Sequence, residues 1–181
     1  MPGNIKNKTN FFPFRSFSDT VFMNLDGGNN KMFEIFFFVN PIGINCYQNE
    51  QEIIAAVSGY QQNISYHFIP MTTMNTIRND IRARHLSSSN VEIFNTFSQS
   101  AYNATKDYHI LKLIVGNKKA RQYIIKLQHA INDMGKIYSS ELINEILSSL
   151  DVSIKSFKKN RESNYIKLSM DKDCLLYTSP S

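Results

Sequence analysis

The chain has 181 residues, of which 42% are hydrophobic and 19% charged, and its formal net charge at pH 7 is +5. This length suits one globular domain with its own hydrophobic core, and the composition excludes an intrinsically disordered tail. Two cysteines cannot build a disulfide scaffold. No apolar run approaches the ~20 residues of a membrane span, and none forms the apolar block of a secretory signal. We therefore expect a cytoplasmic protein without membrane contact.

The first 31 residues show no regular pattern of apolar side chains. Residues 10–17 have neither a helical nor a strand period, and residues 26–31 are typical of a turn without strands around it. At Met32 the pattern becomes regular at once. We therefore expect residues 1–31 to be a non-native or disordered upstream segment, with Met32 as the true start. The alternative is a flexible N-terminal arm.

A strand, a helix and a second strand are predicted within residues 32–71. Residues 32–39 form an almost continuous apolar run, which is typical of a strand buried on both faces, and Pro41 and Gly43 then indicate a loop. A helix follows over residues 47–58, and residues 64–69 form the second strand. Connections this short predict a right-handed βαβ unit with parallel strands.

Residues 72–173 are predicted to form one inserted helical domain. Helices are expected over residues 72–84, 91–115, 117–134, 142–150 and 153–162, and the third of these, closed by Gly135, has the strongest pattern in the chain. The apolar positions expected to face the core in the two long helices are Phe94, Phe97, Ala101, Ala104, Tyr108, Leu111, Ala120, Tyr123, Ile124, Leu127, Ala130, Ile131 and Met134.

The last eight residues, Cys174-Leu-Leu-Tyr-Thr-Ser-Pro-Ser181, interrupt the charged helical pattern before them. They resemble translated sequencing-adapter DNA, so we expect residues 174–181 to be an artefact and the gene to be truncated near Asp173. A parallel pair of apolar strands also needs further strands to be stable. We therefore expect the C-terminal strands of the sheet to be missing from this chain.

The positive charges do not indicate a nucleic-acid surface. A phosphate-binding face needs its cations gathered on one side. The cations with the closest spacing fit solvated helix faces instead, and we expect no nucleic-acid partner. These are Arg78, Arg82 and Arg84, and the run Lys155, Lys158, Lys159 and Arg161.

The loop after the first predicted strand resembles a known redox motif. It runs Asn40-Pro-Ile-Gly-Ile-Asn-Cys46-Tyr47, and the redox loop of the DsbA-like thioredoxin superfamily reads Asp-Pro-x-Cys-Pro-x-Cys-Tyr. Pro41, Cys46 and Tyr47 match, Asn40 stands for the aspartate, and Gly43 stands for the attacking cysteine. The resemblance covers residues 32–173 and implies an α/β, thioredoxin-like fold of DsbA type with a large inserted helical domain. Within this superfamily the chain resembles the relatives of the Spx adaptor (YjbH or SpxH) of lactobacillus type.

Glycine at position 43 decides between the functions that this resemblance implies. Dithiol exchange needs an attacking thiolate and a second, resolving thiol. The first hypothesis is therefore a non-catalytic adaptor that presents a stress regulator, Spx, to the ClpXP protease, with partner contacts expected at Asn40, Pro41, Gly43, Cys46 and Tyr47. The second is a thiol-disulfide oxidoreductase or isomerase in which Cys46 alone is catalytic. Cys46 also suits a purely structural role as a small apolar residue, and a ligand-binding or glutathione-dependent relative is a third alternative.

No other group of residues points to a catalytic or metal site. The four histidines show no metal-ligand spacing with one another or with Cys46, and His67 is expected to be an ordinary strand histidine. Asp107-Tyr-His109 lies near no recognisable nucleophile in the sequence, and no glycine-rich phosphate loop occurs. We expect neither a metal nor a cofactor.

Overall fold

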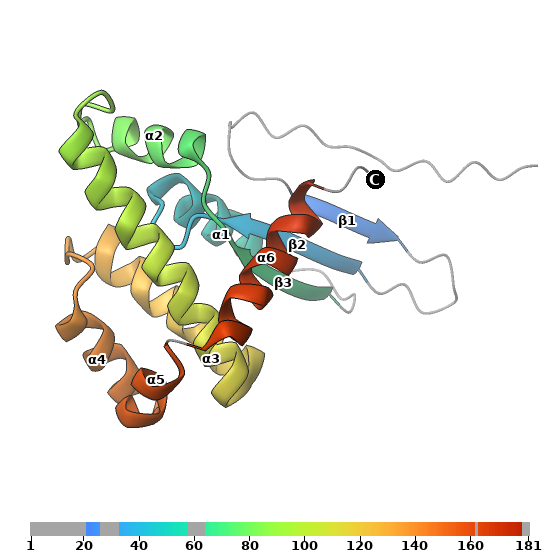
Figure 1. Cartoon of the computed structure of the whole chain (residues 1–181). Coiled ribbons are helices and arrows are strands. Elements are labelled where there is room, and N and C mark those ends of the chain that lie inside the picture. Colours follow the sequence, from blue (N-terminus) through green and yellow to red (C-terminus); the bar gives the residue numbers. More distant parts are fainter. Residues whose placement is uncertain (1–20, 26–32, 58–63, 162, 179–181) are drawn as a thin grey trace, which may run out of the picture.

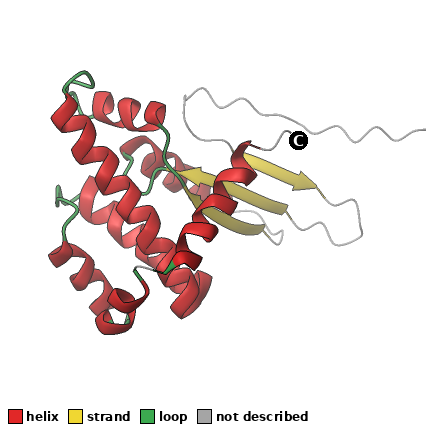
Figure 2. Ribbon diagram, viewed as in Figure 1, coloured by secondary structure: helices red, strands yellow, loops and turns green. Residues whose placement is uncertain are grey.

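The fold is known from a computed structural model, which describes residues 21–25, 33–57, 64–161 and 163–178. A small sheet lies at one side of the molecule and helices fill the other side (Figures 1 and 2). In chain order the elements are β1 (Val21–Leu25), β2 (Phe33–Val39), α1 (Ile44–Val57), β3 (Ile64–Pro70), α2 (Met74–Ala83), α3 (Val91–Asn132), α4 (Ser140–Ser149), α5 (Ile154–Asn160) and α6 (Asn164–Thr178).

The sheet has the order β1-β2-β3 over the described residues. β3 runs parallel to β2, with Pro70 opposite Val39, which confirms the predicted parallel pair. β1 runs antiparallel to β2 on its other side, with Leu25 opposite Phe33. The expectation that residues 1–31 contain no regular structure is therefore wrong for β1. A five-residue strand has too few positions to show a period, and the neighbouring β2 supplies its hydrogen bonds. The non-native origin of residues 1–31 stays a prediction.

The sheet and α1 share a small apolar core. The apolar character of β2 follows from burial, since its last three residues, Phe37, Phe38 and Val39, have exposed fractions of 5% or less. The core side chains on the α1 side are Ile35, Phe37, Val39, Cys46 and Phe68, against which Ile53 and Ile54 pack. The first turn of α1 is thereby fixed to the end of β2, where the candidate loop begins.

α3 is the central element of the helical side. The helices α1, α2, α4, α5 and α6 and the strand β3 all pack against it. It is interrupted at Gly116, whose φ of 83° and ψ of 171° are not helical, so the two predicted helices are confirmed as two segments that meet at a kink. Of the positions predicted to face the core, Ala101, Ala104, Tyr108, Leu111, Ala120, Tyr123, Ile124, Leu127 and Ala130 are buried, and Phe94, Phe97 and Ile131 pack against them.

Met134 departs from the predicted stripe. It is 57% exposed, because α3 ends at Asn132 and Gly135, with a φ of 65°, turns the chain away. The spacing from Ile131 would bury this methionine only if the helix continued. The prediction that Met134 belongs to the core is therefore wrong.

Replacing Gly116 with alanine is expected to destabilise the protein by about 1–3 kcal/mol, because a φ of 83° with a ψ of 171° is strained for any residue with a Cβ atom. No atom lies within 4 Å of the position of the added Cβ, so the loss would come from the backbone alone. Urea unfolding of Gly116→Ala measures it. Asn117→Ala, at an exposed neighbouring position, is the control and should change the stability by less than about 0.5 kcal/mol.

α6 continues without interruption through Cys174 to Thr178. The expected break of helical pattern at Cys174 is therefore wrong for the backbone, whereas the artefactual origin of residues 174–181 stays a prediction. The helix packs on α3 through the buried Ile166 and through a polar contact, since Ser169 Oγ lies 2.8 Å from His109 Nδ1. Within the described ranges, none of the helices combines the length and the apolar composition that a membrane crossing requires.

Candidate functional site

The loop between β2 and α1 folds back on the first turn of the helix. The Gly43 N–H donates to the Asn40 carbonyl over 2.9 Å, and the Ile42 N–H donates to Asn40 Oδ1 over 3.2 Å. The Asn40 N–H in turn donates to Cys46 Sγ over 3.3 Å. Both the side chain and the backbone of Asn40 therefore hold the loop, and the thiol of Cys46 is part of that arrangement.

Four of the five predicted contact residues lie inside the protein. Asn40 is 2% and Cys46 4% exposed, and Pro41 and Gly43 are also buried. Only Tyr47 is half-buried and reaches the surface. Of the five predicted contact residues, only Tyr47 therefore has side-chain surface that a partner could reach. The other four residues offer a partner almost none.

The absence of a side chain at position 43 fits the packing around it. A Cβ atom there would lie 3.0 Å from Asn40 Cβ and 3.2 Å from Asn40 Nδ2. The Asn40 Nδ2 atom is buried and has no hydrogen-bond partner. A larger residue at position 43 would therefore require the Asn40 side chain to move by a few tenths of an ångström.

An ion pair between the buried Asp80 of α2 and the half-buried Arg84, which follows α2, supports the loop. Arg84 Nε lies 3.2 Å from Asp80 Oδ2, and Asp80 is 3% exposed. The guanidinium also donates to the Ile42 carbonyl over 2.8 Å and to Asn132 Oδ1 over 2.7 Å. Burial raises the pKa of Asp80, against the effect of the Arg84 charge and of the Ile44 N–H that donates to this carboxylate. The pair joins the loop, α2 and the end of α3.

Tyr47 connects the loop to an exposed polar group at the end of α3. Its hydroxyl donates to Asp133 Oδ2 over 2.6 Å, and His129 Nδ1 lies 2.7 Å from the same oxygen. The bond to Asp133 is the main reason why the pKa of Tyr47 rises to about 12, and that bond and the bond to His129 lower the pKa of Asp133. This carboxylate is therefore ionised at neutral pH and marks the surface next to the loop.

The thiol chemistry open to this site is narrow. Dithiol exchange needs an attacking thiol before the resolving one, and Gly43 provides none. Cys46 is buried, and the other cysteine, Cys174, is exposed on α6. Among the described residues, His, Cys, Asp and Glu side chains nowhere gather in threes as metal ligands do. The loop residues Asn40, Pro41 and Gly43 are buried like Cys46, so the loop is a packed part of the structure.

One cluster away from the loop has the residue types of a nucleophilic triad. His109 Nδ1 lies 2.8 Å from Ser169 Oγ, and His109 Nε2 lies 3.6 Å from Asp173 Oδ2. His109 is 1% exposed, and burial is the main reason why its pKa falls to about 4. A histidine closed off from solvent in this way joins α6 to α3 and has no access to a substrate.

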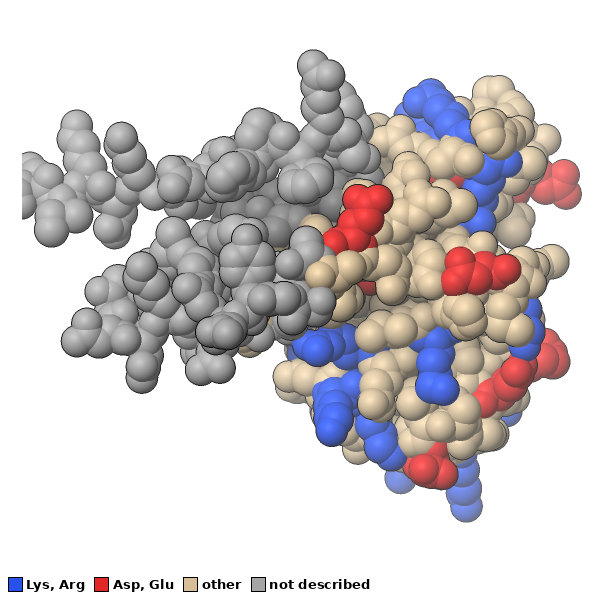
Figure 3. Space-filling view, turned by 180° about the vertical axis from the view of Figure 1, so that it is seen from behind, with Lys and Arg blue, Asp and Glu red and all other residues tan. Residues whose placement is uncertain are grey.

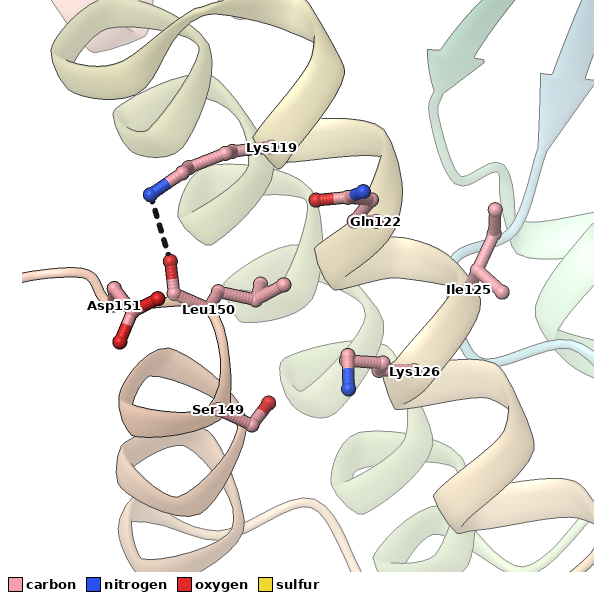
Figure 4. Close-up of a pocket in the computed structure, with 7 residues that line it drawn as sticks. All are labelled: Lys119, Gln122, Ile125, Lys126, Ser149, Leu150 and Asp151. Carbon is pink, nitrogen blue, oxygen red and sulfur yellow. Dashed lines mark hydrogen bonds between the residues drawn. The ribbon is translucent and has the colours of Figure 1, made fainter.

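Two surface hollows lie beside the helices α3 and α4 and the turns that adjoin α4 and α5. The first, of about 380 Å³, lies between α3 and the end of α4 (Figure 4). Its Lys119 Nζ donates to the Leu150 carbonyl over 2.8 Å, so this cation stabilises the C-terminus of α4. The second, of about 840 Å³, is lined mainly by hydroxyl and amide side chains of α3 and α4, with Arg161 as its charged residue. On the face shown in Figure 3 the basic side chains are divided among several places with acidic ones between them.

The sequence analysis missed Asp80 as part of the site, and its expectation of a solvated helix face is wrong for Arg84, which is half-buried against the loop. A signal for Asp80 was present, because Ile77, Asp80 and Ile81 follow the helical spacing of one buried stripe. A carboxylate on an apolar stripe requires a buried partner. One such partner is the N–H of Ile44, which is 36 positions away in the sequence. No pattern along the chain reveals this contact.

Comparison with known proteins places the loop within a larger match. Residues 36–178 match a family model described as thioredoxin. No curated protein matches this chain. The match begins in β2 and ends in α6, so it includes the βαβ unit and the helical block, and it confirms the expected thioredoxin-like fold of DsbA type with its helical insertion.

Proposed function

Since the chain belongs to the thioredoxin family, we propose that it is a non-catalytic binding protein of this family, an adaptor that holds a stress regulator of the Spx type and presents it to the ClpXP protease. The observation that carries the proposal is Gly43 at the position of the attacking cysteine. Losing that group disables a two-thiol mechanism and leaves the surface of the fold available for binding.

Burial of the remaining thiol supports the same proposal. Cys46 is 4% exposed, and its sulfur accepts the Asn40 N–H over 3.3 Å. A reactive cysteine sits in a partly exposed, electropositive environment, whereas a buried structural cysteine is inert. We infer that Cys46 serves the packing between α1 and β2.

The surface next to the loop suits a protein partner. Met134 is 57% and Ile137 80% exposed, and both follow Asp133, the residue bonded to Tyr47. Exposed apolar side chains that follow an ionised carboxylate closely along the chain suit a binding surface. We therefore propose that the partner contacts Tyr47, Asp133, Met134 and Ile137, and that the buried loop residues fix the position of Tyr47.

The alternative function is a thiol-disulfide oxidoreductase or isomerase that acts through Cys46. One observation favours it, since Cys46 keeps the position of the resolving thiol in the first turn of α1. A single thiol can form a mixed disulfide with a substrate, and an external thiol such as glutathione would then release it. The two functions differ in whether Cys46 is required.

Replacing Cys46 with serine is expected to leave partner binding and regulator degradation within about twofold of the unchanged protein, because the binding surface does not include this thiol. The measurement is the rate of loss of an Spx-type regulator in a reconstituted ClpXP reaction, with binding measured in parallel. Met134→Ser/Ile137→Ser should lower both by at least about tenfold, which corresponds to ~1.4 kcal/mol. Leu168→Ser on α6, exposed to 66%, is the matched control and should change neither.

Three outcomes of this experiment would contradict the proposal. If the unchanged protein neither binds the regulator nor accelerates its degradation, the adaptor function is refuted. Disulfide reduction by the unchanged protein that disappears in Cys46→Ser would establish the oxidoreductase instead. An effect of Leu168→Ser as large as that of the Met134/Ile137 pair would refute the proposed contact surface.

A further inference from the structure

The first backbone amide of α1 donates a hydrogen bond to a carboxylate from another element. Ile44 is the first residue of α1, and its N–H donates to Asp80 Oδ1 over 2.8 Å. The amides at the start of a helix carry a partial positive charge, which makes this the natural position for an anion. In this chain the position is filled from within, by a residue of α2 that is 3% exposed.

Arg84 keeps the Asp80 carboxylate in this place. Its Nε donates to Asp80 Oδ2 over 3.2 Å, while its Nη2 donates to the Ile42 carbonyl and to Asn132 Oδ1. The guanidinium also lies 5.5 Å from the centre of the Phe97 ring. With these contacts on several sides, neither member of the pair can turn away without leaving buried polar atoms unpaired.

The position of this carboxylate bears directly on thiol chemistry in the loop. A thiolate at residue 43 would be stabilised by the amides at the start of α1 and by the nearby Arg84 cation. The Asp80 carboxylate neutralises both of these positive features. A second anion placed beside it would be destabilised by charge repulsion.

We propose that Asp80 is a specificity-determining residue of this loop, whose carboxylate prevents thiolate chemistry there even when a thiol is supplied at position 43. The inference rests on the proposed function and deepens it, since it explains how the loop remains a fixed support for a binding surface. Two features, and not one, then separate this loop from a redox loop: the missing thiol and the internal anion.

The test supplies the missing thiol with and without the carboxylate. In the full chain carrying Cys174→Ser, Gly43→Cys is compared with Gly43→Cys/Asp80→Asn. In each turnover the introduced thiolate attacks a substrate disulfide, and the leaving sulfur takes up a proton. Reduced glutathione then attacks the mixed disulfide and releases the second substrate thiol. A second glutathione frees the introduced thiol as oxidised glutathione forms, so two electrons and two protons pass from glutathione to the substrate. Insulin disulfide reduction at pH 7 gives the rate.

The double variant is expected to react at least about tenfold faster than Gly43→Cys alone. Both variants carry the same close approach to Asn40, so this strain cancels in the comparison. Gly43→Cys/Asp151→Asn, in which an exposed carboxylate is removed, is the matched control and should react as slowly as Gly43→Cys. Circular dichroism checks folding. If Asp80→Asn unfolds the chain, Asp80→Ser, which keeps an oxygen that can accept the Ile44 N–H, takes its place.

The outcomes separate this inference from the proposed function. Equal rates for Gly43→Cys with and without the Asp80 carboxylate would overturn the role of Asp80 and leave the adaptor function untouched. Insulin reduction by the unchanged protein, with Gly43 in place, would instead overturn the proposed function. A second readout is the alkylation rate of the introduced thiol between pH 5 and 9, measured with Cys46→Ser. Its midpoint should move to lower pH when Asp80 is replaced, and an unmoved midpoint contradicts the inference.

Discussion

Replacing Arg84 with alanine is expected to lower the free energy of unfolding by about 3–5 kcal/mol at pH 7. Removing the cation of an ion pair whose carboxylate is buried leaves that carboxylate charged and without its counter-ion. Here the charge left behind is Asp80, which is 3% exposed. The Ile42 carbonyl and Asn132 Oδ1 would lose their donor as well. Urea unfolding followed by circular dichroism measures the loss.

The loss should be smaller at pH 5 than at pH 7. Burial already raises the pKa of Asp80 with Arg84 present, and removal of the guanidinium raises that pKa further. A folded-state pKa above that of the unfolded chain means that the folded state takes up a proton more readily as the pH falls. Protonation then relieves the unpaired charge of the Arg84→Ala variant, and part of its lost stability returns.

Two further variants test this explanation. Arg82→Ala removes a cation from the same helix, but its contact with Ser88 is exposed, so a change below about 0.5 kcal/mol is expected. Asp80→Asn/Arg84→Ala should be more stable than Arg84→Ala, because asparagine keeps an acceptor for the Ile44 N–H and removes the buried charge. If Arg84→Ala and Arg82→Ala lose equal stability, the ion pair does not support the loop.

The helical part of the fold could be predicted because burial follows the helical period. Ala120, Tyr123, Ile124 and Leu127 stand at helical spacing, and all four are fully buried. The same spacing predicted burial for Met134, and there it failed. The reason is local, since the left-handed backbone of Gly135 follows the end of α3. The spacing of hydrophobic residues does not show where a helix ends.

The candidate site could be predicted only in part, because its key contacts join distant elements. The motif from Asn40 to Tyr47 pointed to this loop, and loops are ordinarily at the surface. Arg84, however, ties this loop to α2 and to the end of α3, and the residues chosen as partner contacts are mostly buried. Contacts between residues more than 35 positions apart leave no period in the sequence, so neither the Asp80 contact with α1 nor the surface beside Tyr47 could be predicted.

His109, buried at the contact between α3 and α6, should make the protein less stable as the pH falls from about 6.5 to 4. Burial, together with the Lys112 charge, lowers the pKa of His109 in the folded state to about 4 from its ordinary value of 6.5. Above pH 6.5 the ring is neutral in both states and contributes nothing. Between pH 6.5 and 4 the unfolded chain binds a proton that the folded chain does not. The free energy of unfolding therefore falls by about 3 kcal/mol over this range.

Comparison of the unchanged protein with His109→Gln isolates this contribution. Asp173, 3.6 Å from His109 Nε2, titrates with the opposite sign, because burial raises its pKa, and Lys112 lies 3.9 Å from the same carboxylate oxygen. Both groups remain in the variant, so their effects cancel in the difference. The variant should be the less stable protein at pH 7 and should lose less stability on going to pH 4.5. Parallel stability curves for the two proteins would show that His109 is not buried as a neutral ring between α3 and α6.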